Sequence, residues 1–232
     1  MSITLAPRRA DFCIIIPTLN EAGHIEDNLR ALINRLDADH KVDILISDGG
    51  SSDKTVVLAQ IFPLSVIHSP RGRAAQMNSA ARATRANWLI FLHADSCLPT
   101  GWMSAIECSD KLWGRFDVTL DGRHWLFRFI EKAINLRSCV SSVATGDQAM
   151  FFRADFFRQL GGFPDIPLME DIAISKLARR HQRAACLQPA VITSARRWQK
   201  NGILRTILLM WLLRLAYWFG INPEQLHRIY YK

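Results

Sequence analysis

Short apolar runs alternate with amphipathic stretches over the first ninety-five residues of the chain. The runs occupy residues 12–16, 42–46, 64–68 and 88–92. Between the first two runs, apolar residues recur at helical spacing after Asn20, which is a suitable helix cap. Ser51 or Ser52 could cap a second helix ending at Gln60, and a third helix is expected over residues 73–84. This alternation predicts strand-helix-strand units around a mostly parallel sheet, the pattern of an α/β fold.

The second half of the chain has a less regular pattern. It predicts a strand at 115–120 with one face in water, strands at 148–152 and 185–193, and helices at 124–136, 154–160, 171–180 and 203–219. Repeats, low-complexity tracts and long linkers are absent from the sequence. We therefore expect residues 1–95 and 96–200 to share one core, followed by a basic and apolar helical tail at 201–232.

Polar residues follow each of the four apolar runs in the first half. They lie at positions 17–21, 47–53, 69–73 and 93–95. Ligands of doubly wound sheets bind beyond the carboxyl ends of the parallel strands. The sequence thus predicts one binding site at that edge of the sheet.

Four motifs in these loops and beyond resemble those of the family 2 glycosyltransferases, which have the GT-A fold. They are Pro17-Thr18-Leu19-Asn20-Glu21, Asp48-Gly49-Gly50-Ser51-Ser52-Asp53, His93-Ala94-Asp95 and Glu170-Asp171. Residues 71–78 and 194–198 are similar to those of a small bacterial subgroup described as radical-SAM or selenium-associated transferases. The resemblance implies a Rossmann-like, mostly parallel central sheet, with nucleotide binding in residues 1–95 and acceptor binding in 96–200.

The same resemblance implies inverting, metal-dependent transfer of one sugar. The donor would be a nucleoside diphosphate sugar, with a UDP-sugar favoured, and the acceptor a hydroxyl or carboxylate, on a lipid or carotenoid for example. The cation, Mn²⁺ or Mg²⁺, would be held by Asp95, because hard divalent ions take carboxylate oxygens. His93 replaces the first aspartate of the family's Asp-x-Asp motif, and we expect it to face the same side as Asp95 if the strand continues. Its nitrogen would suit Mn²⁺ better than Mg²⁺.

Asp48 resembles the family aspartate that binds the nucleotide base; alternatively, Asp48-Gly49-Gly50 is only a turn. The other residues that the resemblance assigns to nucleotide-sugar binding are Pro17, Thr18, Glu21, Arg71, Arg73, Ala94, Arg197 and Trp198. The two arginines after the third run could equally be solvated. Arg196, Arg197 and Trp198 resemble a truncated remnant of the family's Gln-x-x-Arg-Trp signature without its glutamine. The resemblance implies that they steady the diphosphate and that Trp198 could stack under an acceptor; alternatively, they only open a basic amphipathic helix.

A displacement at the anomeric carbon needs one carboxylate to take the acceptor's proton. Asp171 is the candidate base, with Glu170 beside it expected to raise the pKa of Asp171. Two acids at a helix start also simply favour the helix dipole. Asp147 is the alternative base.

The net charge of +8 is concentrated in the tail, since residues 196–232 hold seven basic residues and one acidic residue. Beside apolar and aromatic residues, this charge favours anionic lipid over nucleic acid as a partner. The two arginines of the segment 203–219, Arg205 and Arg214, fall on opposite sides of a helix, which argues against a clean in-plane membrane helix. The tail could pack on the domain, form a homodimer or contact the inner face of the cell membrane.

Five widely spaced cysteines without a CxxC pair predict free thiols and a cytoplasmic location. The apolar run at 13–16 near the N-terminus is too short for a signal-peptide core, and the run at 206–213 is too short to span a membrane. A sugar-nucleotide nucleotidyltransferase is an alternative function, although it would show a Gly-rich basic loop after the first strand. A membrane-associated, non-catalytic nucleotide-binding protein is the other alternative.

Overall fold

The computed structural model describes residues 10–37 and 39–230, without the side chain of Arg197. Within these residues one sheet has the strand order β3-β2-β1-β4-β7-β6-β8-β5. Its strands are β1 Phe12–Thr18, β2 Val42–Asp48, β3 Ser65–His68, β4 Trp88–Phe91, β5 Ser96–Cys97, β6 Trp113–Leu120, β7 Met150–Arg153 and β8 Ala185–Thr193. The helices are α1 Ile25–Ile33, α2 Thr55–Ala59, α3 Arg73–Ala83, α4 Trp102–Glu107, α5 Trp125–Ser141, η1 Gly146–Gln148, α6 Ala154–Gln159, α7 Glu170–Ala178, α8 Arg196–Asn201, α9 Ile203–Trp218 and α10 Pro223–Tyr230.

The four strands of the first half run parallel, with β1 at the centre between β2 and β4. In the second half, β7 is antiparallel to both β4 and β6, whereas β6 and β8 are parallel. The carboxyl ends of β1 to β4 therefore meet at one edge of the sheet, as the sequence predicts.

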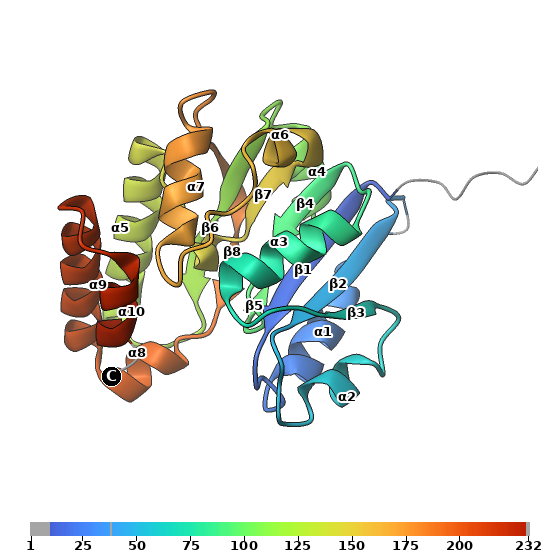
Figure 1. The fold of residues 1–232 in the computed structure, drawn as a ribbon, viewed down its shortest axis with the longest axis horizontal. Coiled ribbons are helices and arrows are strands. Elements are labelled where there is room, and N and C mark those ends of the chain that lie inside the picture. The colour runs from blue at the N-terminus through green and yellow to red at the C-terminus, as the bar shows by residue number, and fades with distance from the viewer. Residues whose placement is uncertain (1–9, 38, 231–232) are drawn as a thin grey trace, which may run out of the picture.

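Helices cover both faces of the sheet (Figure 1). One face packs against α3, α6 and α7 through a core that includes Ile15, Phe91 and Phe152. The other packs against α1, α2 and α4 through a core that includes Ile14, Ile46 and Trp102. Side chains of β1 alternate between these cores, so the strand is apolar throughout. This three-layer arrangement confirms the predicted α/β class.

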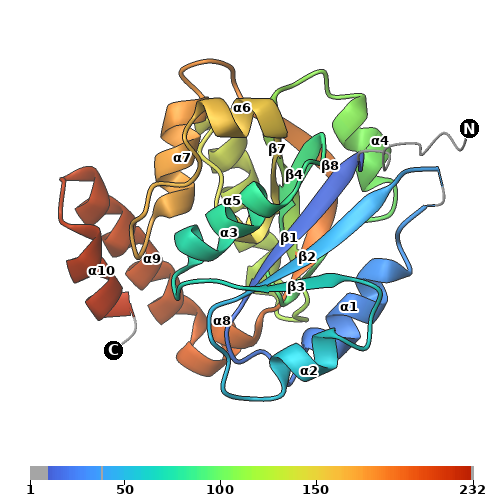
Figure 2. The ribbon, with the colours of Figure 1, turned by 45° about the vertical axis from the view of Figure 1, so that its right-hand side comes forward.

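Helices α9 and α10 lie at the side of the molecule away from α1 and α2 in both views (Figures 1 and 2). Helix α9 packs against α5 in a small core containing Ile130 and Ile207. Its opposite end packs against the start of α7 and against α10, where Leu213 and Leu226 are buried with Ile172. The tail is thus attached to the domain. Helix α10 lies within the predicted helical tail, whereas the sequence pattern did not predict the short α4.

Two predicted helix caps are wrong. Helix α1 begins at Ile25 with His24 at its cap position, because Asn20 instead accepts a hydrogen bond from the backbone N–H of Ser52. Helix α2 begins only at Thr55, because Ser51 takes part in the preceding turn. In both cases a polar residue bonds across the loops rather than to its own helix.

The prediction of a water-facing side on β6 is also wrong. Its side chains are buried or half-buried, and Arg115 is only 1% exposed. Helix α5 covers this strand: the Arg115 guanidinium donates to the carbonyl of Asn135 and pairs with Asp117. The alternation of polar residues correctly predicted a strand, but it could not show that α5 covers the strand's polar face.

The expectation of free cysteines fails for one pair. Cys139 of α5 and Cys186 of β8 form a disulfide across 47 residues of chain, whereas Cys13, Cys97 and Cys108 are free thiols. Sequence spacing alone could not bring these two positions together.

Over residues 10–37 and 39–230, the helices all fall short of the combination of length and apolar character needed to cross a bilayer.

Candidate functional site

The loops after β1 and β2 are joined at the sheet edge. Thr18 and Asp48, the last residues of the two strands, are register partners, and the Thr18 hydroxyl donates to Asp48 Oδ1 at 3.2 Å. Gly49 N–H donates to the Thr18 carbonyl at 3.0 Å. The predicted convergence of these loops is therefore confirmed.

Asp48 organises the turn that follows β2. Its Oδ2 accepts from the backbone N–H groups of Gly50 and Ser51, both at 2.9 Å, and its Oδ1 also accepts from the Ser51 hydroxyl. The carboxylate is 1% exposed. Burial raises the pKa of Asp48, but the hydrogen bonds from Ser51, Gly50 and Thr18 outweigh it and leave the pKa below its usual value. Asp48 is held ionised as part of a turn.

Gln76 of α3 is a site residue that the sequence reasoning did not single out. Its side-chain amide donates to the backbone carbonyls of Thr18 and Ser47, each at 2.8 Å, and so ties the ends of β1 and β2 to α3. A Cβ at Gly49 would lie 2.9 Å from the Gln76 side chain, so the turn requires glycine there. The signal available in the sequence was a polar residue, Gln76, among the apolar residues of the helix predicted at 73–84.

Arg196, the first residue of α8, brings the distant C-terminal segment to the loops. Its guanidinium lies 3.0 Å from Glu21 Oε2 and 3.3 Å from Asp95 Oδ2. Burial alone would lower the pKa of Arg196, but the two carboxylates raise it above its usual value. The group is thus a fixed positive charge between two acids that the sequence places in one site.

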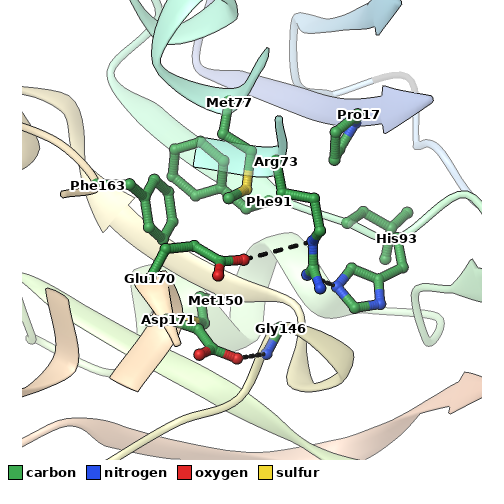
Figure 3. Close-up of a pocket in the computed structure, with 11 residues that line it drawn as sticks. Pro17, Arg73, Met77, Phe91, His93, Gly146, Met150, Phe163, Glu170 and Asp171 are labelled. Carbon is green, nitrogen blue, oxygen red and sulfur yellow. Dashed lines mark hydrogen bonds and ion pairs between the residues drawn. The ribbon is translucent and has the colours of Figure 1, made fainter. Parts of the chain in front are cut away.

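A small pocket lies between β4, α3, η1 and α7 (Figure 3). Its open volume is about 10 Å³, about what one water molecule requires. It is lined by Pro17, Arg73, Met77, Phe91, Leu92, His93, Gly146, Met150, Phe163, Glu170 and Asp171. Apolar walls thus surround two adjacent carboxylates and one guanidinium.

Arg73 connects the two ends of the pocket (Figure 3). Its Nε lies 3.4 Å from Glu170 Oε1, and its Nη2 contacts His93 Nε2. Burial, reinforced by Arg73, holds the pKa of His93 well below its usual value, so the imidazole is neutral. Burial also raises the pKa of Glu170 to about 7; Arg73 opposes the shift and Asp171 adds to it. From the sequence we expect the raised pKa at Asp171, whereas the buried acid in the structure is Glu170.

Asp171 faces the same pocket but is anchored differently. Its Oδ2 accepts from the backbone N–H of Gly146 at 2.8 Å, and the residue is half-buried. A Cβ at Gly146 would meet the ends of the Arg73 and His93 side chains, so glycine allows this approach without displacing them. Asp147 follows in the chain, but it does not line the pocket, and its buried Oδ1 has no hydrogen-bond partner among the described residues.

The loop before α7 is fixed by Asn78, another residue without a predicted role. Its side chain donates to the Phe163 carbonyl at 2.8 Å and accepts from the Phe163 N–H at 2.9 Å. Through this pair α3 positions the approach to Glu170 and Asp171. Asn78 belongs to the segment 71–78 that resembles a transferase subgroup, but only the fold shows that its partner is Phe163, 85 residues away.

The remaining predicted site residues are distributed unevenly. Pro17 lines the pocket, and Ala94 is buried with its carbonyl accepting from Asn28. Arg71 is exposed on the loop after β3. Trp198 packs against the core of Leu120 and Phe127. The side chain of Arg197 lies outside the described part of the structure.

The premise that paired His93 with Asp95 is wrong. Strand β4 ends at Phe91, so strand alternation does not extend to these residues, and His93 turns to Arg73 while Asp95 turns to Arg196. The described residues contain no cluster of three or more His, Cys, Asp or Glu side chains able to hold a metal. Asp95 remains suitable as a single carboxylate ligand, whereas the Nε2 atom of His93 is in contact with Arg73.

Comparison with known proteins agrees with this geometry. Residues 13–106 match the family described as Glycosyl transferase family 2. The chain is 29% identical over 167 residues to PGL/p-HBAD biosynthesis glycosyltransferases of Mycobacterium bovis and Mycobacterium tuberculosis. The match covers 66% of this chain and 62% of those relatives, so the chain spans less than two thirds of their length. An uncharacterized glycosyltransferase of Haemophilus influenzae is 29% identical over 86 residues, which is 36% of this chain and 29% of that protein.

Solved structures share the fold. S. aureus TarS 1–349 superimposes with a TM-score of 0.66 at 15% identity, over 80% of this chain and 60% of that chain. The mannosyltransferase PcManGT of Pyrobaculum calidifontis, solved with GDP-Man and Mn²⁺, has a TM-score of 0.58 at 23% identity, over 81% of this chain and 57% of that chain. The predicted GT-A fold is thus confirmed, and the resemblance to family 2 glycosyltransferases is confirmed over residues 13–106.

Proposed function

We propose that the protein is a glycosyltransferase that moves one sugar from a nucleoside diphosphate sugar to an acceptor, with inversion at the anomeric carbon. One observation carries the proposal: Arg196 joins Glu21 and Asp95, while Arg73 joins His93 and Glu170, at a single edge of the sheet. The family match and neighbours solved with UDP, UDP-GlcNAc or GDP-Man support a donor of this class. The finer likeness to radical-SAM or selenium-associated transferases stays a prediction.

The base of the donor would bind beside Asp48. A carboxylate accepts the imide N–H of uracil, which is why a UDP-sugar is favoured. All four hydrogen bonds to Asp48 now come from the protein, so either the Thr18 or the Ser51 hydroxyl must turn away before a base can bind. Asp48 then both shapes the turn and reads the base.

The diphosphate would lie beside Asp95 and Arg196. Asp95 is half-buried and offers carboxylate oxygens, and Mg²⁺ or Mn²⁺ sites at phosphates need only one or two protein carboxylates. A bound divalent cation would neutralise the charge that develops on the leaving diphosphate. Arg196 must release Asp95 for that, and its guanidinium is then free to bind phosphate oxygens. Because Arg73 contacts His93 Nε2, the proposal assigns the ion to Asp95 and does not choose between Mn²⁺ and Mg²⁺.

Asp171 would take the proton of the incoming acceptor. It faces the pocket from the start of α7, and the Gly146 N–H fixes one of its oxygens. Glu170 is shielded by Arg73 and Phe163 and positions the arginine instead. The apolar surroundings exclude water, which would otherwise compete with the acceptor. The acceptor itself would be a hydroxyl or carboxylate carried on a lipid, because α9 exposes large apolar side chains and packs on Ile172, the residue after Asp171.

Nucleotide release from sugar nucleotides tests the proposal. The purified protein is incubated with UDP-glucose, UDP-GlcNAc or GDP-mannose and Mn²⁺ or Mg²⁺, and the free nucleoside diphosphate is measured. We expect release from one donor, reduced about a hundredfold or more in Asp95→Ala. Asp39→Ala, an exposed acid before β2 at the other end of the parallel strands, is the matched control and should leave release unchanged.

Two results would contradict the proposal. Undiminished release by Asp95→Ala would remove the assigned diphosphate site. Formation of pyrophosphate from a nucleoside triphosphate and a sugar phosphate would identify a nucleotidyltransferase instead.

A further inference from the structure

Helices α5 and α9 each expose a row of large apolar side chains, which together we name the outer face. On α9 the row consists of Leu204, Leu208, Trp211, Leu212, Leu215, Trp218 and, just beyond the helix, Phe219. On α5 it consists of Trp125, Phe129, Leu136 and Val140. Trp211 and Trp218 are each 71% exposed. Apolar rows of this extent on a folded domain mark an interaction surface.

The outer face is not an unpacked core. The opposite side of α9 is already buried: Ile207 packs toward α5, Leu213 toward α7 and α10, and Lys176 of α7 lies over the Tyr217 ring at 4.8 Å. Figures 1 and 2 both place α9 at the rim of the molecule, with α10 beside it. The exposed row therefore faces away from the domain.

The two arginines of α9 do not disrupt this row. Arg205 is exposed near the start of the helix, whereas Arg214 is half-buried. Burial first, and then the charge of Arg214, lower the pKa of Arg137 of α5 to about 10, which places Arg214 toward the domain. The two charges do lie on different sides of the helix, as the spacing predicted, but the buried one leaves the outer face apolar.

The exposed charges on α5, α8 and α9 themselves are positive among the described side chains. Lys132 of α5, Lys200 of α8 and Arg205 of α9 are exposed. Helices α8 and α9 contain no acidic residue, and the one acid of α5, Glu131, is buried and accepts a hydrogen bond from the Leu120 N–H. An anionic partner is therefore complementary to this surface.

We propose that the outer face docks the protein on an anionic lipid bilayer, with α5 and α9 in contact with the interface. Tryptophan and phenylalanine are suited to the headgroup boundary, leucines to the acyl region below it, and the flanking lysines and arginine to lipid phosphates. A second copy fits less well, because both sides of a twofold interface would carry exposed basic residues and no exposed acid from α5, α8 or α9 to pair with them.

The surface is also connected to the proposed site. Helix α8, which leads into α9, begins at Arg196 beside Asp95, and α9 packs on Ile172 next to Asp171. Docking would bring a lipid-borne acceptor to the site. This consequence rests on the proposed function, but binding to the bilayer does not.

Vesicle co-sedimentation tests the docking without any substrate. The full chain is mixed with phosphatidylcholine vesicles that do or do not contain phosphatidylglycerol, and the bound fraction and the tryptophan emission are measured. We expect binding to the anionic vesicles, a blue shift of the emission and weaker binding as salt is raised from about 0.1 M to about 0.5 M. Trp211→Glu and Trp218→Glu should each weaken binding about tenfold or more.

Ile61→Glu is the matched control, since Ile61 is a 65% exposed apolar residue on the far side of the molecule near α2. It should bind vesicles like the unaltered chain, and circular dichroism should show all variants folded. Three results would overturn the proposal: no binding to anionic vesicles, equal binding by the tryptophan variants, or a dimer in light scattering that the same variants dissociate. Nucleotide release is measured without vesicles, so loss of one property does not obscure the other.

Discussion

The site contains two buried carboxylates, Asp48 and Glu170, whose pKa values shift in opposite directions. Asp48, at the end of β2, accepts four hydrogen bonds, and these hold its pKa below its usual value against the effect of burial. Glu170, at the start of α7, is about as buried and pairs with Arg73, and burial raises its pKa to about 7.

The difference follows from how each region is built. Gly50 and Ser51 of the turn after Asp48 supply three of its four hydrogen bonds, and Thr18 of the neighbouring strand β1 supplies the fourth. Glu170 lies among Met77, Phe91 and Phe163, side chains from three separate segments, which give it little hydrogen bonding. The hydrogen bonds of the turn thus fix the conformation of Asp48 and keep it ionised. The pocket around Glu170 instead holds a carboxylate whose protonation changes near neutral pH, with a second acid, Asp171, next to it.

Replacing Asp171 by asparagine should produce the largest effect on turnover. If this residue takes the acceptor's proton, kcat should fall about 10² to 10⁴-fold with little change in donor KM. Transfer to acceptor is the measurement, with Asp147→Asn as the matched comparison that retains most activity. The reverse order of the two variants would move the base to Asp147.

Replacing Asp48 by alanine should reduce both stability and donor binding. Four donors lose their acceptor, so the free energy of unfolding should fall by on the order of 3 kcal/mol and the donor KM should rise about tenfold or more. Denaturant unfolding and donor titration measure the two effects. Asp43→Ala, an exposed acid on the same strand, should change neither. A lower stability with an unaltered KM would show that Asp48 only shapes the turn.

Replacing Glu170 by glutamine should have a smaller, pH-dependent effect on stability. The folded pKa of about 7 exceeds the ordinary value of 4.5, so the fold binds this proton more tightly than the unfolded chain. The contribution of Glu170 to stability is therefore greatest below about pH 4.5, declines through pH 7 and is least above it. The neutral variant should melt like the unaltered chain near pH 4.5 and higher at pH 8, by on the order of 2 kcal/mol or about 4 to 8 °C.

Thermal melts across pH measure that difference, with the exposed Glu224→Gln as control. A variant that melts lower at pH 8 would mean that the ion pair with Arg73 stabilises the fold more than burial of the charge destabilises it. Glu170 would then resemble Asp48 rather than contrast with it.

The same contrast explains what the sequence could predict. Strands β1 to β4 and the loops that follow them were predictable because apolar runs and adjacent turn residues are local signals. The roles of His93 and Glu170 were not, because each depends on Arg73 arriving from another segment. Gln76, Asn78 and the disulfide partners likewise depend on contacts over tens of residues, which no local pattern encodes. The exposed rows on α5 and α9 required knowing which helix faces are covered.

A crystal structure with UDP and Mn²⁺ tests the central claim most directly. We expect the uracil beside Thr18 and Asp48, the diphosphate and an ion at the Asp95 carboxylate, and Arg196 turned from Asp95 toward phosphate. A nucleotide bound away from these loops, or a diphosphate with Arg196 still paired to Asp95 and no ion beside it, would show that the donor site is not at these residues.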